Sequence, residues 1–440
     1  MWRAAQQTFV KYHRTAAPMA FCMGVASIRP VQTWMEAAAK RECYSYGCPY
    51  LPQDIYYDGH VKTALAELRT MKREDIQEDP STGRKEKESL QPLDASGRKE
   101  AGTLTLIGYK GGPLETQINQ DRAFCIVPYT IEEGAPNKKK RSRLGRRSSP
   151  PSPQQQPEAP IEGRLIGVFD GHANLGEHVS QFVVTELPKL LASKLRSLEQ
   201  ATVHQVTQAL IETFIELDQK APADISGGCT ASVVFQHGPK VYFANAGDSR
   251  SFLVVYRKKT ARVEVIYITR EDKPHLQDER ERVESRGGKV YLPFQGTSRV
   301  LYTDPVSGML SGLAMSRSIG DWEVGKVGVI PDPIVHVIDI PELVEAQLKE
   351  GKGSQAEDDV HIFAVSATDG MMDFISPEAI GHALANSLYG KEGTHLLTTL
   401  EQLIYIAAQR WEQSRQGRYR DDIAVAVSQI RIPTDGLAKQ

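Results

Sequence analysis

The stretch Leu165-Ile-Gly-Val-Phe-Asp-Gly-His172 passes from a largely apolar run directly into an acid, a glycine and a histidine. A short apolar run bounded by a turn dipeptide is typical of a buried β-strand. Asp-Gly is also a common turn, so one such pair does not establish a functional site. Asp248 and Asp369 stand in the same position, because each comes after a strand-like apolar run. The sequence therefore predicts β-strands whose ends carry carboxylates.

Periodicity along the chain predicts a mixture of strands and helices. Strands are expected at residues 104–107, 123–127, 165–169, 231–235, 241–244, 252–256, 263–268, 361–365 and 423–427. Helices are expected at residues 177–195, 203–220, 377–387 and 394–413. The strands come in clusters and do not alternate strictly with helices. This order favours an α+β domain with mostly antiparallel sheets and helices packed outside them.

Composition excludes several classes of protein. The 440 residues carry 53 Lys and Arg against 55 Asp and Glu, and the net charge of −2 does not favour a general nucleic-acid-binding protein. Five irregularly spaced cysteines indicate a reducing compartment rather than a disulfide framework. Since no apolar run is long enough to span a bilayer, we expect no membrane span.

Two segments lie outside the regular pattern. Residues 1–100 are interpreted as an N-terminal extension and linker of unknown role, which could dock on a partner. Residues 132–163, rich in Pro, Gln, Ser and basic residues, predict a disordered surface insertion. The basic cluster from Lys138 to Arg147 is open to four interpretations: a solvated loop, a nuclear-import signal, a docking loop for an acidic partner, or a phosphorylation site with Ser148 and Ser149. Residues 432–440 form a short tail.

The expected compartment is the cytoplasm, with two alternatives. The basic cluster would direct the chain to the nucleus. Residues 1–35 contain no acid and resemble a mitochondrial presequence, although an ordinary docking helix or a disordered start explains them equally well.

Five aspartates predict a metal site. Asp170, Asp248 and Asp369 follow apolar runs, whereas Asp121 and Asp421 precede them. In antiparallel sheets, strand starts and strand ends can share one edge, so all five carboxylates can converge. Converging carboxylates repel one another unless cations neutralise them, and oxygen ligands select Mg²⁺ or Mn²⁺. A pair of such ions about 3.5–4 Å apart suits phosphoester hydrolysis.

Ordered motifs resemble a known family. They are Val168-Phe-Asp-Gly-His172, Gly228-Cys-Thr-Ala231, Asn245-Ala-Gly-Asp-Ser-Arg250, Lys273-Pro274, Gly287-Gly288, Leu313-Ala-Met-Ser-Arg-Ser-Ile-Gly-Asp321, Thr368-Asp-Gly370 and Arg420-Asp-Asp-Ile423. The chain resembles the type 2C, metal-dependent family of protein serine/threonine phosphatases, in a plant- and protist-like branch. The resemblance covers about residues 101–431, and it implies a catalytic domain of two stacked antiparallel β-sheets flanked by helices.

The resemblance also implies roles for individual residues. Asp170 would bridge two Mg²⁺ or Mn²⁺ ions, Asp369 and Asp421 would complete the first site, and the Gly171 carbonyl would touch the second. His172 matches the proposed general acid that protonates the leaving serine or threonine oxygen.

Two further aspartates have outer roles in the same scheme. Asp121 would act through metal-bound water, and Asp248 with Asp369 resembles a third, weaker metal site. Catalysis would be direct attack of the bridging water on the phosphorus of a phosphoprotein, without a phosphoenzyme.

Departures from the family pattern keep an alternative open. Thr116 stands where many relatives have an arginine that grips the substrate phosphate, and Ala173 takes a position that is usually glycine. Lys110 could replace the missing charge, or it could be an ordinary solvated lysine. The alternative function is therefore a weakly active or inactive scaffold protein. A nucleic-acid-binding role for the basic cluster is weaker, because it lacks an accompanying groove-reading element.

Overall fold

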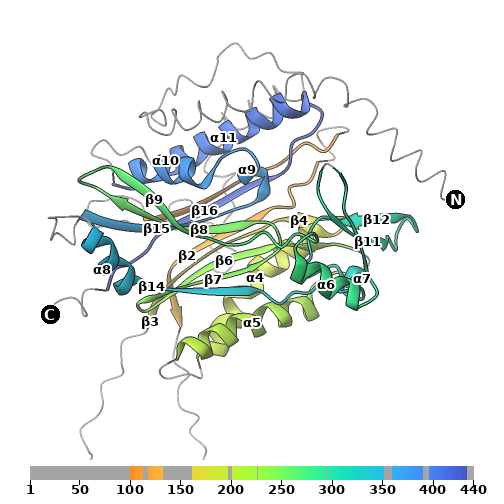
Figure 1. Cartoon of the computed structure of the whole chain (residues 1–440), viewed down its shortest axis with the longest axis horizontal. Helices are drawn as coiled ribbons and strands as arrows, with labels where there is room; N and C mark the ends of the chain where they lie inside the picture. Colours follow the sequence, from red (N-terminus) through yellow and green to blue (C-terminus); the bar gives the residue numbers. More distant parts are fainter. Residues whose placement is uncertain are drawn as a thin grey trace, which may run out of the picture.

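Two five-stranded antiparallel sheets lie face to face in the computed structural model, and helices cover their outer faces (Figure 1). The structure describes residues 100–111, 117–131, 161–196, 201–224, 226–294, 296–350, 359–389 and 396–433. The first sheet has the order β1 (Ala101–Leu106), β16 (Ile423–Gln429), β15 (Val360–Ala367), β8 (Arg250–Arg257) and β9 (Arg262–Ile268). The second has the order β14 (Ile334–Asp339), β7 (Lys240–Ala246), β6 (Ala231–His237), β3 (Ile161–Phe169) and β2 (Arg122–Ile131).

Apolar side chains hold the layers together. Apolar residues from both sheets, among them Ile166, Phe243 and Ala426, form a core between the sheets. The first sheet is covered by α9 (Asp369–Met372), α10 (Pro377–Tyr389) and α11 (Leu396–Arg415), and the second by α4 (Gly176–Leu195) and α5 (Val203–Lys220). The predicted α+β sandwich of stacked antiparallel sheets is confirmed.

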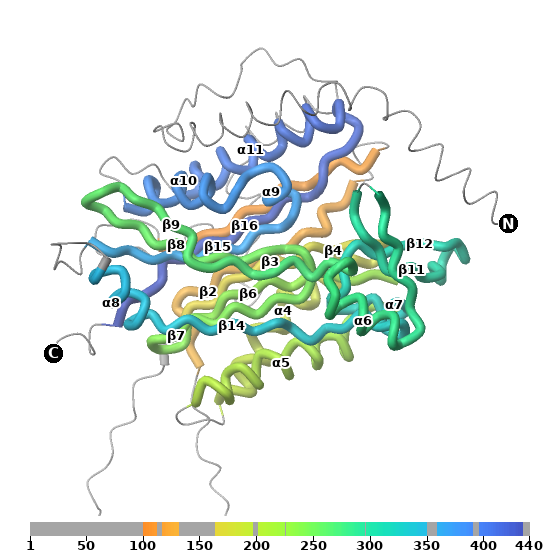
Figure 2. The backbone as a smooth tube through the Cα atoms, viewed as in Figure 1, coloured from red at the N-terminus to blue at the C-terminus, as the bar shows by residue number. Residues whose placement is uncertain are grey.

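Shorter elements cluster at one end of the sandwich (Figure 2). A small sheet has the order β13 (Ile319–Gly320), β5 (Gly228–Cys229) and β4 (Gly171–His172). Another consists of β10 (Lys289–Tyr291), β11 (Arg299–Thr303) and β12 (Leu310–Leu313). Of the remaining helices in the described chain, α6 (Gln277–Ser285) and α7 (Trp322–Gly325) lie at this end, whereas α8 (Ile340–Glu350) lies at the opposite end.

Each strand and helix expected from periodicity is present, with boundaries that differ by a few residues. Several elements were not expected. The small sheets have strands of two to five residues, too short to show a period. Helix α6 has the sequence QDERERVES and buries only Glu279 and Val283, so hydropathy could not reveal it.

The flanking segments are only partly described. Strand β3 begins at Ile161, so the strand starts inside the range predicted for the insertion. The remainder of that insertion, the extension before Glu100 and the tail after residue 433 lie outside the described residues. None of the helices in the described ranges is long and apolar enough to cross a membrane.

Candidate metal centre and active site

Strand register brings the predicted carboxylates to one edge of the sandwich. Arg122 at the start of β2 pairs with Phe169 at the end of β3, so Asp121 and Asp170 flank one register pair. In the first sheet, Ala367 at the end of β15 pairs with both Arg250 and Val425. The residues just beyond these positions include Asp369, Asp248 and Asp421. The sheets therefore place starts and ends of strands together, as the spacing predicts.

Three of the carboxylates meet directly. Oxygen atoms from Asp170, Asp248 and Asp369 all lie within 4.8 Å of one another. Asp121 Oδ1, Asp248 Oδ1 and Asp369 Oδ1 are buried and have no hydrogen-bond partner among the residues that the structure describes. A buried carboxylate oxygen without a hydrogen-bond partner destabilises the folded state. A set of such oxygens is suited to coordinate a hard divalent cation. The donor set therefore fits Mg²⁺ or Mn²⁺.

The electrostatics of the cluster indicate the same need for a cation. Burial and the neighbouring carboxylates of Asp121 and Asp421 raise the pKa of Asp170 well above its ordinary value. Burial, followed by the charge of Asp170, likewise raises the pKa of Asp369. Ionised carboxylates are destabilised here by lost solvation and mutual repulsion, and a bound cation would offset both effects.

Two lysines lie against this acidic edge. Lys273 Nζ donates to Asp248 Oδ2 at 2.5 Å, and Lys110 Nζ lies 3.3 Å from Asp421 Oδ1 and 3.2 Å from Asp422 Oδ2. Burial lowers the pKa of Lys110, but the carboxylates of Asp422 and Asp421 outweigh it and the net shift is upward. The Lys110 side chain is 36% exposed, so its ammonium is both paired and accessible from solvent.

Asp421 and Asp422 differ in their partners. The Tyr419 hydroxyl donates to Asp421 Oδ2 at 2.8 Å. Asp422 is buried and accepts backbone N–H bonds from Gly108 at 2.5 Å and Gln120 at 3.1 Å. Lys110 contacts both acids, but Asp422 also anchors the backbone at Gly108 and Gln120, whereas Asp421 acts on the charge of Asp170.

Hydroxyl groups link the two sheets behind the carboxylates. Ser251 on β8 hydrogen-bonds Ser232 on β6 and Ser366 on β15, each at 2.7 Å, and all three are fully buried. The Thr368 hydroxyl donates to Asp121 Oδ2 at 2.8 Å, and Asp170 N donates to Thr230 Oγ1 at 3.0 Å. These contacts hold acids from both sheets in a fixed relation.

The loop after His172 is fixed by one side chain. Gln120 Nε2 donates to the Ala173 carbonyl and to Glu177 Oε2, each at 2.9 Å. Ala173 has φ 60°, the left-handed region in which a glycine is free and a methyl group is strained. A Cβ on Gly171 would lie 2.6 Å from the Gln120 carbonyl oxygen, so only glycine fits there.

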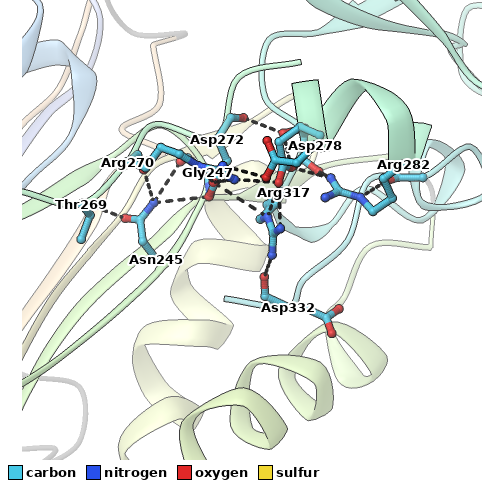
Figure 3. Close-up of polar contacts among 12 residues, drawn as sticks. Asn245, Gly247, Thr269, Arg270, Asp272, Asp278, Arg282, Arg317 and Asp332 are labelled. Atoms are coloured by element: carbon cyan, nitrogen blue, oxygen red, sulfur yellow. Dashed lines mark hydrogen bonds and ion pairs between the residues drawn. The ribbon is translucent and has the colours of Figure 1, made fainter. Parts of the chain in front are cut away.

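A network of charged side chains around the buried Asp272 contacts the backbone at Gly247, the residue before Asp248 (Figure 3). Asp272 accepts the Gly247 N–H at 3.1 Å and pairs with Arg270, also at 3.1 Å. Burial raises the pKa of Asp272 to about 6 despite these partners. Glu279 on α6 accepts from Arg270 Nη2 at 2.8 Å. The network also includes Arg282, Arg317 and the exposed Asp278.

His172 pairs with an acid to which the sequence motifs assigned no role. Its Nε2 lies 2.6 Å from Asp321 Oδ2, and the two side chains are 20% and 5% exposed. Burial opposes protonation of His172, but the Asp321 carboxylate outweighs it and raises the pKa. The sequence shows Asp321 at the end of the motif Ser-Ile-Gly-Asp, but it does not show that the Asp321 side chain contacts His172. Of the two departures from the family pattern, Ala173 is described above, and Thr116 lies outside the described residues.

Comparison with known proteins agrees with this geometry. The sequence profile of the family described as "Protein phosphatase 2C" matches residues 132–383. The chain is 30% identical over 236 residues to "Probable protein phosphatase 2C 61" of Arabidopsis thaliana, a match that covers 51% of this chain and 65% of that protein. It is 28% identical over 284 residues to "Probable protein phosphatase 2C 48" of Oryza sativa subsp. japonica, covering 59% and 72%.

A solved structure has the same fold. The crystal structure of serine-threonine phosphatase 2C from Toxoplasma gondii matches with a TM-score of 0.53 at 18% identity, and the match covers 78% of this chain and 98% of that chain. The match to the Arabidopsis protein thus spans just under two thirds of that relative, while the family profile spans more than half of this chain. With stacked antiparallel sheets and acids gathered at one edge, the chain belongs to the protein phosphatase 2C family.

Proposed function

We propose that this protein hydrolyses phosphoserine and phosphothreonine in proteins, with two Mg²⁺ or Mn²⁺ ions and a weaker third. The observation that carries the proposal is the approach of the Asp170, Asp248 and Asp369 oxygens to within 4.8 Å in a chain of this family. Asp170 is the proposed shared ligand of two ions. Asp369 and Asp421 would complete the first site, and the Gly171 carbonyl would contribute to the second.

Asp121 and Asp248 have outer positions in this scheme. Asp121 is 1% exposed and hydrogen-bonded to Thr368, which suits a role through an intervening water. Asp248, with Asp369, is the proposed ligand pair of the third ion. When bound, the ions supply Lewis-acid activation of water and neutralise the phosphate charge.

The chain's own side chains supply the remaining chemistry. His172 is the proposed general acid, which gives its proton to the leaving serine or threonine oxygen while water attacks the phosphorus directly. Lys110 is the candidate contact for the substrate phosphate, because its partly exposed ammonium lies at the same edge as the acids. An uncharged Thr116 makes that contribution more important.

The test is hydrolysis of a phosphothreonine peptide by the full chain, with Mn²⁺ or Mg²⁺ and with chelator. We expect metal-dependent turnover that falls by at least about 10²-fold in Asp170→Asn and in Asp369→Asn. Asp278→Asn, an exposed acid on α6, is the matched control and should retain wild-type turnover.

The alternative of an inactive scaffold is not favoured, because the proposed metal carboxylates are all present and converge. Absence of turnover in the wild type, with metal binding still detected by calorimetry, would restore it. Cytoplasm is the proposed compartment. The docking prediction concerns residues 1–100 and the basic cluster, the nuclear prediction the basic cluster, and the mitochondrial prediction residues 1–35; all three stay predictions.

A further inference from the structure

The contact between His172 and Asp321 depends on an arrangement of backbone that is specific to this end of the sandwich. In the small sheet β13-β5-β4, His172 pairs in register with Gly228, and Gly228 pairs with Gly320. Asp321 follows Gly320 directly, so its carboxylate reaches across the central strand to the histidine on the far one. The two residues are separated by 149 positions in the sequence and meet only through this sheet.

Gly228 makes the crossing possible. A Cβ at this position would collide with the Asp321 carboxylate, so the side chain occupies the space that glycine leaves. The backbone of Asp321 has φ 51° and ψ 39°, a left-handed conformation that is strained for a residue other than glycine. Asp321 N also donates to the Gly227 carbonyl at 2.9 Å, which fixes this conformation. The strained backbone conformation thus occurs at the residue whose carboxylate contacts His172.

The Asp321 carboxylate is held in one orientation. Its Oδ2 accepts from Ser318 Oγ at 2.7 Å and lies 2.6 Å from His172 Nε2. Asp218 Oδ1 accepts the N–H of Gly320 at 2.8 Å, so the preceding residue is fixed as well. The other ring nitrogen of His172, Nδ1, is buried. The Asp321 contact at Nε2 therefore sets the orientation of the whole ring.

We propose that Asp321 is the positioning residue of His172: by holding Nε2, it fixes the orientation of the imidazole ring at the acidic edge. The inference rests on the proposed function, in which His172 is the general acid. A carboxylate that orients the ring of a general acid contributes to proton transfer without touching the substrate. Its effect should therefore scale with how much the leaving group needs a proton.

The experiment compares two substrates in the Mn²⁺-loaded enzyme. The alkoxide of a phosphothreonine peptide needs protonation to leave, whereas p-nitrophenolate does not. For Asp321→Asn we expect kcat on the peptide to fall by about 10²-fold, kcat on p-nitrophenyl phosphate to fall by less than about threefold, and both KM values to stay near wild type. His172→Asn should show the same selectivity, and the double variant should lose little more than either single variant.

Gly228→Ala is a second, independent variant. It keeps both Asp321 and His172 but places a methyl group where the carboxylate lies, so it should give the same substrate-selective loss. Asp278→Asn is again the control that should change neither substrate. Calorimetric Mn²⁺ binding separates a positioning defect from damage to the metal site, because positioning alone leaves the affinity unchanged.

The outcomes separate this inference from the proposed function. An equal loss on both substrates in Asp321→Asn, or an unchanged kcat on the peptide, would overturn the positioning role while wild-type phosphatase activity stands. Additive losses in the double variant would also overturn it, because they mean that Asp321 does not act through His172. Absence of metal-dependent turnover of either substrate by the wild type would instead refute the proposed function, and this inference with it.

Discussion

Substitution of Glu279 by glutamine should lower the free energy of unfolding more than the same kind of substitution at an exposed acid on the protein surface. The Glu279 side chain is fully buried although it lies on the polar helix α6. Its Oε1 accepts from Arg270 Nη2 at 2.8 Å and Arg317 Nη2 at 2.7 Å, and its Oε2 accepts from Arg282 Nη2 and Ser316 Oγ, each at 2.6 Å. Glutamine has the same shape but no charge, and its amide group presents donors to other donors.

The magnitude follows from the pKa of the carboxyl group. Burial alone would raise the pKa of Glu279, but hydrogen bonds from Arg282, Arg317 and Ser316 outweigh it and lower the pKa from 4.5 to about 2. A downward shift of this size corresponds to about 3 kcal/mol of stability at neutral pH. Removal of one partner from a buried ion network typically costs about 3–5 kcal/mol. We expect Glu279→Gln to lower the free energy of unfolding by about 3 kcal/mol.

The pH dependence provides an internal check on the cause. Because the folded-state pKa lies below the unfolded value, the stabilisation is complete above the unfolded pKa and is lost as the pH falls toward the folded one. The difference between wild type and Glu279→Gln should therefore decrease from about 3 kcal/mol at neutral pH to about 2 kcal/mol near pH 3.5.

Urea denaturation followed by circular dichroism, in the presence of chelator, measures this difference. Asp278→Asn is the matched control. Asp278 pairs with the same Arg270 at 2.7 Å but is 60% exposed, so its loss should cost less than about 0.5 kcal/mol. A cost below about 1 kcal/mol for Glu279→Gln, or a difference that does not change with pH, would refute the idea that the network stabilises this end of the fold.

Three further predictions concern the metal edge. In chelator, Asp170→Asn should melt at or above the wild-type temperature, because it removes a buried charge with a raised pKa, whereas Mn²⁺ should raise the melting temperature of the wild type alone; stabilisation of both proteins by Mn²⁺ would contradict this. Gly370→Ala should lower stability by more than about 2 kcal/mol and abolish Mn²⁺ binding by calorimetry, since its Cβ would collide with the Asp422 carbonyl. Trp411→Phe, which loses the 2.7 Å bond from Nε1 to the Gly370 carbonyl and part of the ring packing against Phe374 and Tyr419, should cost at least about 1–2 kcal/mol in urea denaturation and leave Mn²⁺ bound.

Much of the fold follows from local pattern. The strand ending at Phe169 and the helix from Val203 to Lys220 were predicted from residues close to one another, because periods of 2 and 3.6 residues are local properties. The aspartates at strand ends indicated a metal site for the same reason. The element boundaries and helix α6 were harder to predict from the sequence. One of the two residues that α6 buries is the charged Glu279, so hydropathy does not mark its buried face.

The sequence by itself determined most of the segments that become the longer strands and helices, and which side chains are carried at their ends. Only the tertiary structure decided which atoms meet. Register and sheet stacking bring Asp170, Asp248 and Asp369 within 4.8 Å, and the small sheet sets Asp321 against His172 across a glycine. Such contacts join residues separated by scores to hundreds of positions. A local pattern does not contain them, because they depend on how distant strands pair and pack.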